Sequence, residues 1–110
     1  MYFEIKIEDI VYQHLENQES ISVSLLAQKV KLDRTQLYRK LKKNTGKSPS
    51  VFIREIKLAY SKKLLKENLT TITCIAYRSG FNDVNYFFRC FKQRYGMTPK
   101  LFRDKITYTT

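Results

Sequence analysis

Apolar side chains recur along this chain at the spacing of a helix face, and they predict amphipathic helices joined by short turns. The first helix is expected at residues 5–17 and the longest at 49–67. Their apolar stripes consist of Ile7, Ile10, Val11 and Leu15 in the first, and of Phe52, Ile53, Ile56, Tyr60 and Leu64 in the second. Because the chain has only three glycines and two prolines, helices are favoured over a turn-rich β fold.

Between these segments, polar residues predict where helices begin. Ser22 is placed to cap a short helix at 23–30. Asp33 and Gln36 have the spacing of a capping box at the start of a longer basic helix over 34–45. A helix, a tight turn and a second helix of this size are typical of the helix-turn-helix arrangement.

The same arrangement occurs twice. RKLKKNTGKSP, residues 39–49, is matched fifty residues later by RCFKQRYGMTP. In each copy Gly ends a helix, and Ser or Thr followed by Pro starts the next one. Ala27 to Arg39 spans 12 residues, whereas Ala76 to Arg89 spans 13. The turn of the second copy is therefore one residue longer, and we place the extra residue at Gly80. Asn82 or Asp83 is expected to cap the second long helix, 84–95.

The fold class that follows is all-α, with about seven helices in two helix-turn-helix subdomains joined by a long linker helix. Residues 1–19 are expected to form an acidic helix or linker that packs on the rest of the chain, whose main domain occupies 20–105. We assign the first helix-turn-helix to 22–46, the linker helix to 48–67, the second helix-turn-helix to 71–96, the C-terminal helix to 98–106 and a frayed tail to 107–110.

Charge is distributed unevenly along the chain. Residues 1–20 hold one base and five acids, a net charge of −4, within a chain whose formal net charge is +11. The remaining residues are therefore strongly basic. A charge of that size attracts polyanions such as nucleic acid or an anionic membrane.

The two longer helices each have an apolar back and a polar, cationic front. On a helical wheel Leu37 and Leu41 lie together, while Thr35, Arg39 and Lys42 lie opposite and Tyr38 lies on the flank. The second helix repeats this about Phe87 and Phe91, with Asn85, Arg89 and Lys92 opposite and Phe88 on the flank.

Arg can bind guanine and Asn can bind adenine bidentately, while Val84, Phe88 or the Thr35 methyl can contact thymine methyl groups. Lys42, Lys43, Lys92 and Arg94 lie further along, where we expect phosphate contacts; Gln36 and Lys47 are assigned to phosphates as well.

The linker helix has a length suited to placing the two longer helices in adjacent major grooves of DNA. About 19 residues rise roughly 29 Å, close to the roughly 34 Å between adjacent major grooves on one face of DNA.

No catalytic constellation, metal site or cofactor site is visible. Cys74 and Cys90 lie in helical apolar patterns and are interpreted as small core residues, and His14 as a surface residue. No apolar run is long enough to span a membrane and no leader is present, so we expect a cytoplasmic protein.

The segment IAYRSGFNDVNYFFRCFKQRYGMTPKLFR, residues 75–103, fills every fixed position of the pattern of the AraC/XylS family of bacterial transcription regulators. The chain resembles that family over about residues 20–105. Its first unit looks most like the output domains of hybrid two-component regulators. The resemblance implies a seven-helix module that binds double-stranded DNA.

Carried onto this sequence, the family's base-contacting positions are Arg34, Thr35, Tyr38 and Arg39 in the first unit and Val84, Asn85, Phe88 and Arg89 in the second. Phe88 is a departure, because the family often has a small hydroxyl residue there. The family's separate sensing or dimerisation domain has no counterpart here, so we expect the isolated domain to be monomeric. The second unit is expected to read bases, clamp phosphates or contact RNA polymerase.

Two other functions fit parts of the sequence. A DNA-end-binding segment of a transposase or recombinase also uses paired helix-turn-helix units, but such an enzyme needs a carboxylate metal site, and the acids here are isolated. A basic module that binds a partner or a membrane would not need the tight turns and Gly stops.

Overall fold

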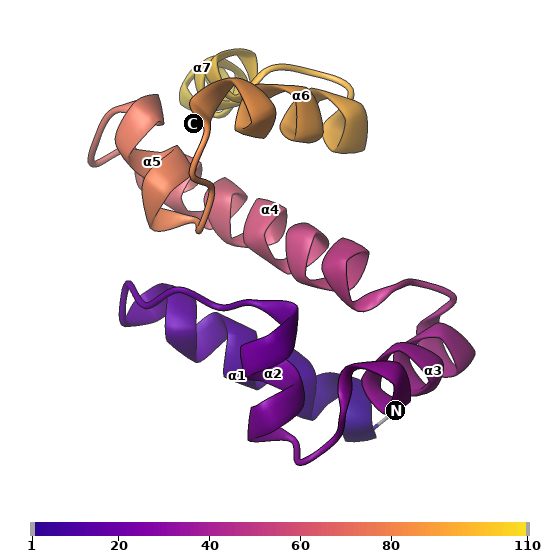
Figure 1. Cartoon of the computed structure of the whole chain (residues 1–110). Helices are drawn as coiled ribbons and strands as arrows, with labels where there is room; N and C mark the ends of the chain where they lie inside the picture. The colour runs from indigo at the N-terminus through magenta and orange to yellow at the C-terminus, as the bar shows by residue number, and fades with distance from the viewer. Residues whose placement is uncertain (1, 110) are drawn as a thin grey trace. The chain divides into compact units, whose positions relative to one another are not determined.

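A computed structural model describes the backbone of residues 2–109 and the side chains as far as Ile106. The described part of the chain consists of seven α-helices and contains no strand (Figure 1). This confirms the predicted all-α fold class. The helices are α1 (Tyr2–Glu16), α2 (Val23–Lys29), α3 (Arg34–Thr45), α4 (Pro49–Glu67), α5 (Ile72–Arg78), α6 (Val84–Tyr95) and α7 (Pro99–Thr109). The chain divides into two compact units, Met1–Ile56 and Lys57–Thr110, so α4 contributes its first turns to one and the remainder to the other.

The first unit is built on an aliphatic core. Helix α1 packs against both α2 and α3, and α2 packs against α3. The side chains of Ile7, Val11, Leu26, Leu37 and Leu41 are completely buried. The apolar stripe of the acidic N-terminal helix thus covers α2 and α3, while Glu8, Asp9 and Glu16 are exposed.

The second unit has an aromatic core. Helix α6 packs against α5 and α7. The Phe91 ring is fully buried and lies edge-on to three others: 5.8 Å from Phe87, 4.7 Å from Tyr95 and 5.6 Å from Phe102, measured between ring centroids. Such tilted arrangements suit the ring quadrupoles. Phe91 therefore joins α6 to α7.

The two tight turns correspond residue by residue as far as Phe81. The Leu32 N–H donates to the Ala27 carbonyl at 3.0 Å, and the Phe81 N–H donates to the Ala76 carbonyl at the same distance. Lys31 and Gly80 are equivalent, with φ of 60° and 87°. Our placement of the extra residue at Gly80 was therefore wrong: it lies after Phe81, at Asn82.

The predicted caps of α2 and α3, Ser22 and Asp33, are confirmed, and the structure selects Asp83 over Asn82 as the cap of α6. Its carboxylate accepts from the N–H groups of Asn85 and Tyr86. Asp33 and Gln36 form both bonds of the capping box.

Three details differ from the sequence-based expectations. Helix α1 begins at Tyr2, before the expected residue 5, and α7 continues to Thr109 instead of ending at 106. Threonine lowers helix propensity without stopping a helix, and no Gly or Pro follows Pro99. Cys74 is only half-buried, whereas Cys90 is buried as predicted.

Gly46→Ala is expected to lower the free energy of unfolding by about 1–2 kcal/mol. Gly46 has a left-handed φ of 76°, and no atom lies within 4 Å of the position that a Cβ would take. The loss is therefore due to backbone conformation alone, and denaturant unfolding measures it. Gly46→Asn is the matched control, because asparagine tolerates this conformation better. Equal losses for the two variants would contradict this explanation.

Candidate nucleic-acid interface

The front of α3 is open to solvent because its back is sealed into the core. Leu37 and Leu41 are fully buried, which fixes the rotation of the helix about its own axis. The four base-facing residues expected on this helix are all exposed, and the Tyr38 side chain, at 47 %, is the largest apolar one among them. The set is Arg34, Thr35, Tyr38 and Arg39.

Helix α6 also has 12 residues, as α3 does, and its rotation about its own axis is likewise fixed by buried apolar side chains. Phe87 and Phe91 are fully buried, so Asn85 and Arg89 face outward and are exposed. Phe88 is 38 % exposed although its ring lies 6.0 Å from that of Phe87. Val84 is the exception among the predicted base-facing residues, because it is half-buried.

Tyr86 also lies on the exposed side of α6, although it was not among the predicted site residues. Its ring is 40 % exposed, and the guanidinium carbon of Arg89 lies over it, 5.7 Å from the centroid. The i, i+3 spacing of Tyr86 and Arg89 was the signal available in the sequence.

Cationic side chains gather at the ends of both recognition helices. Lys42 and Lys92 lie in the last turns of α3 and α6, and both are exposed, as are Lys43 and Arg94. The Arg94 guanidinium lies over the ring of Tyr95, 5.8 Å from its centroid. Cations at a helix C-terminus are favourably placed toward the helix dipole.

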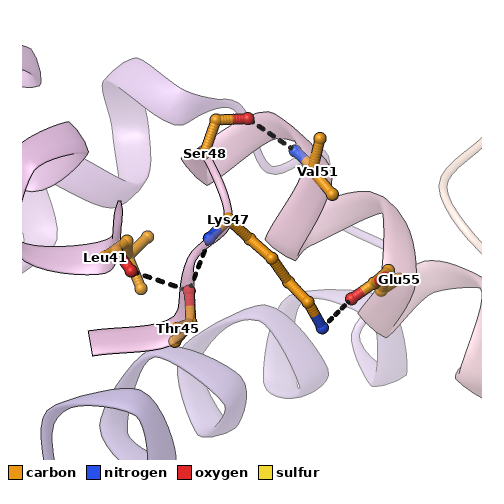
Figure 2. A network of polar contacts seen from close by, with 6 residues as sticks. All are labelled: Leu41, Thr45, Lys47, Ser48, Val51 and Glu55. Atoms are coloured by element: carbon orange, nitrogen blue, oxygen red, sulfur yellow. Dashed lines mark hydrogen bonds and ion pairs between the residues drawn. The ribbon is translucent and has the colours of Figure 1, made fainter. Parts of the chain in front are cut away.

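Two of the predicted phosphate residues have partners in the free protein. The Gln36 Oε1 accepts from the Asp33 N–H at 2.9 Å, and the amide N–H₂ group, the part of this side chain that can donate to a phosphate, is not used in that bond. The Lys47 ammonium is half-buried and paired with the Glu55 carboxylate (Figure 2). Lys47 would have to exchange this carboxylate for a phosphate.

The connection between α3 and α4 is held by a short polar network around Lys47. The Thr45 hydroxyl donates to the Leu41 carbonyl and accepts from the Lys47 N–H, and the Ser48 hydroxyl accepts from the Val51 N–H (Figure 2). This network fixes the start of α4 beside the end of α3.

A hollow of about 390 Å³ lies in the first unit beside the front of α3. It is formed by residues of α2, α3 and the start of α4. Ser48 and Ser50 bring hydroxyl groups to it. Of these two, the sequence had marked only Ser48, as part of a helix start. The hollow is lined by Val23, Arg34, Thr35, Tyr38, Ser48, Pro49 and Ser50.

A partly buried lysine, Lys57, lies on α4, outside the fronts of α3 and α6. Burial lowers the pKa of Lys57, whose ammonium lies 6.0 Å from the Phe81 ring centroid. Within residues 2–109, no three His, Cys, Asp or Glu side chains gather in a way that could hold a metal ion. No helix in that range has the length and apolarity required to cross a membrane.

The chain is similar to known regulators over most of its length. A family model described as a helix-turn-helix domain matches residues 26–105. The transcriptional activator RhaS of Mannheimia succiniciproducens is 37 % identical over 91 residues, which cover 81 % of this chain and 34 % of the activator. Histidine kinase P4 of Formosa agariphila is 33 % identical over 96 residues, which cover 87 % of this chain but 7 % of the kinase.

Among solved structures, the C-terminal domain of the two-component response regulator yesN of Fusobacterium nucleatum is 29 % identical, with a TM-score of 0.79. The similarity covers 94 % of this chain and 99 % of that domain. The chain thus spans about a third of the activator, a small part of the kinase and nearly all of the response-regulator domain. The sequence motif, the fold and these similarities agree, and the chain belongs to the AraC-type family of helix-turn-helix domains found in DNA-binding transcription regulators.

Proposed function

We propose that this chain is the DNA-reading module of a bacterial transcription regulator, with α3 and α6 each placed in the major groove of double-stranded DNA. One observation carries the proposal. Two 12-residue helices each start at an aspartate cap, bury an apolar back completely and expose a front with arginine and an amide or hydroxyl. That front has the donor and acceptor groups that read base edges.

We propose different contacts for the front and the end of each helix. The base-facing set is Arg34, Thr35, Tyr38, Arg39, Val84, Asn85, Phe88 and Arg89. The phosphate-facing set is Lys42, Lys43, Lys92 and Arg94, together with Gln36 and Lys47 through the groups described above. Because α4 has 19 residues, about 29 Å, the two helices are proposed to enter adjacent grooves.

The setting of the module is also a proposal. Similarity to a histidine kinase and to a response-regulator domain supports a two-component regulator in the bacterial cytoplasm, in which a separate part of the protein senses the signal. A contact with RNA polymerase is proposed as an alternative role for the second unit if only the first unit reads bases.

Selection of bound sequences from a random duplex library, at one stated salt concentration, tests the proposal. We expect enrichment of a motif with two boxes about one helical turn apart. A single box would restrict base reading to one unit and leave the other as a phosphate clamp or a polymerase contact. A bound pool without any enriched motif would refute sequence-specific reading.

A further inference from the structure

We infer that Tyr86 is a positioning residue that holds the Arg89 guanidinium ready for base contact on α6. The inference rests on the proposed function, because it concerns how the second unit would read DNA. Tyr86 and Arg89 are three residues apart on one helix and therefore adjacent on its surface. The guanidinium carbon lies over the ring, 5.7 Å from its centroid, which is within the range of a cation–π interaction.

The Tyr86 ring is itself held from beneath. It lies 6.1 Å from the ring of Phe81, at an interplanar angle of 55°. Phe81 is only 4 % exposed, and its ring lies 5.1 Å from that of the fully buried Phe87. A continuous series of rings thus extends from the core of the second unit to the outward-facing guanidinium.

The first unit is constructed differently at the equivalent positions. Gln36 replaces Tyr86, and its side-chain oxygen is used in the capping box with Asp33. Leu32 replaces Phe81 in the turn. The aromatic support of Arg89 on α6 is therefore a feature of the second unit. The otherwise regular sequence repeat does not reveal this difference between the two units.

A supported arginine loses less conformational freedom when it binds. A long side chain that must be ordered on binding weakens the complex, and a guanidinium stacked on a ring is already restricted in orientation. The ring face attracts the positive charge of the guanidinium without accepting a hydrogen bond from it. The guanidinium N–H groups lie in the guanidinium plane, so they can still donate to guanine O6 and N7. Tyr86 therefore supports Arg89 without competing for the base.

A double-mutant cycle on the duplex enriched from the random library tests the inference. Tyr86→Leu is expected to weaken binding about two- to fivefold and to relax the preference for the base that Arg89 reads, in line with an exposed cation–π pair. Tyr86→Phe keeps the ring and should bind within about twofold of the wild type. In an Arg89→Ala background, Tyr86→Leu should have no further effect.

Two controls keep the result interpretable. Thermal unfolding of every variant reports whether a loss of binding reflects a loss of folding, and Tyr86→Phe remains informative if Tyr86→Leu folds poorly. Lys92→Gln should weaken binding by the same factor in the Tyr86→Leu and wild-type backgrounds.

Several results would overturn the inference. If Tyr86→Leu and Arg89→Ala weaken binding independently, Tyr86 acts on its own. If Tyr86→Phe binds as poorly as Tyr86→Leu, the hydroxyl and not the ring is responsible. If Arg89→Ala has no effect while the motif is still enriched, the inference fails but the proposed function stands for α3, whereas failure to enrich any motif would count against the function itself.

Discussion

Arg39→Ala should weaken binding to the enriched duplex by about 1–3 kcal/mol and relax the preference at one base pair. Arg39 is exposed on the front of α3, directly opposite the buried pair of Leu37 and Leu41, so its guanidinium is directed away from the core. A bidentate contact to guanine accounts for a loss of this size. Titration of the variant against the enriched duplex and against variants of each base pair measures both effects.

Lys42→Gln is the matched comparison for Arg39→Ala. Lys42 lies in the last turn of the same helix and is also exposed, but we assign it to a phosphate. Its replacement should weaken binding to all duplexes about equally and reduce the slope of log affinity against log salt by about 1. If Arg39→Ala instead weakens binding to random and enriched duplexes by the same factor, Arg39 is a phosphate contact and base reading must lie elsewhere on α3.

The parts of the fold that depend on local chemistry could be predicted from the sequence. The caps of α2, α3 and α5 are each set by one hydroxyl or carboxylate within three residues of the N–H group that it accepts from. The glycine ends of α3 and α6 are local in the same sense, since both depend on a single left-handed residue. The rotation of α3 and α6 followed because each needs two apolar residues, four positions apart, in the core.

Features that depend on contacts between segments could not be placed. The position of Asn82 as the extra residue becomes clear only from the bond between the Phe81 N–H and the Ala76 carbonyl, which a comparison of spacings does not reveal. The pairing of Lys47 with Glu55 joins the turn to α4 across eight residues, whereas the sequence had predicted only a phosphate contact for Lys47. Tyr86 was not predicted because its proposed role depends on contact with Arg89, and on the helical wheel it lies at the side of the front.

The two units also differ in what their repeated positions do. Lys31 and Gly80 hold the same left-handed conformation, although only glycine adopts it without cost. Lys40 and Cys90 are equivalent, yet the lysine is exposed with its ammonium 4.4 Å from the Phe3 ring centroid, whereas the cysteine is buried. The copies thus share a backbone plan, while the packing around each recognition helix is particular to its own unit.

Phe91→Ala is expected to lower the free energy of unfolding by about 3–5 kcal/mol, because it leaves a cavity among three rings. The Phe91 side chain is fully buried and contacts Phe87, Tyr95 and Phe102, which belong to α6 and α7. A loss of that size is a large fraction of the stability of a small domain. Hydrogen exchange should show faster exchange of the backbone amides of α6 and α7 than of α1 and α3. Phe91→Leu is the matched control and should lose less, because it retains most of the apolar volume; a change below about 1 kcal/mol for Phe91→Ala would show that the core of the second unit closes around the cavity.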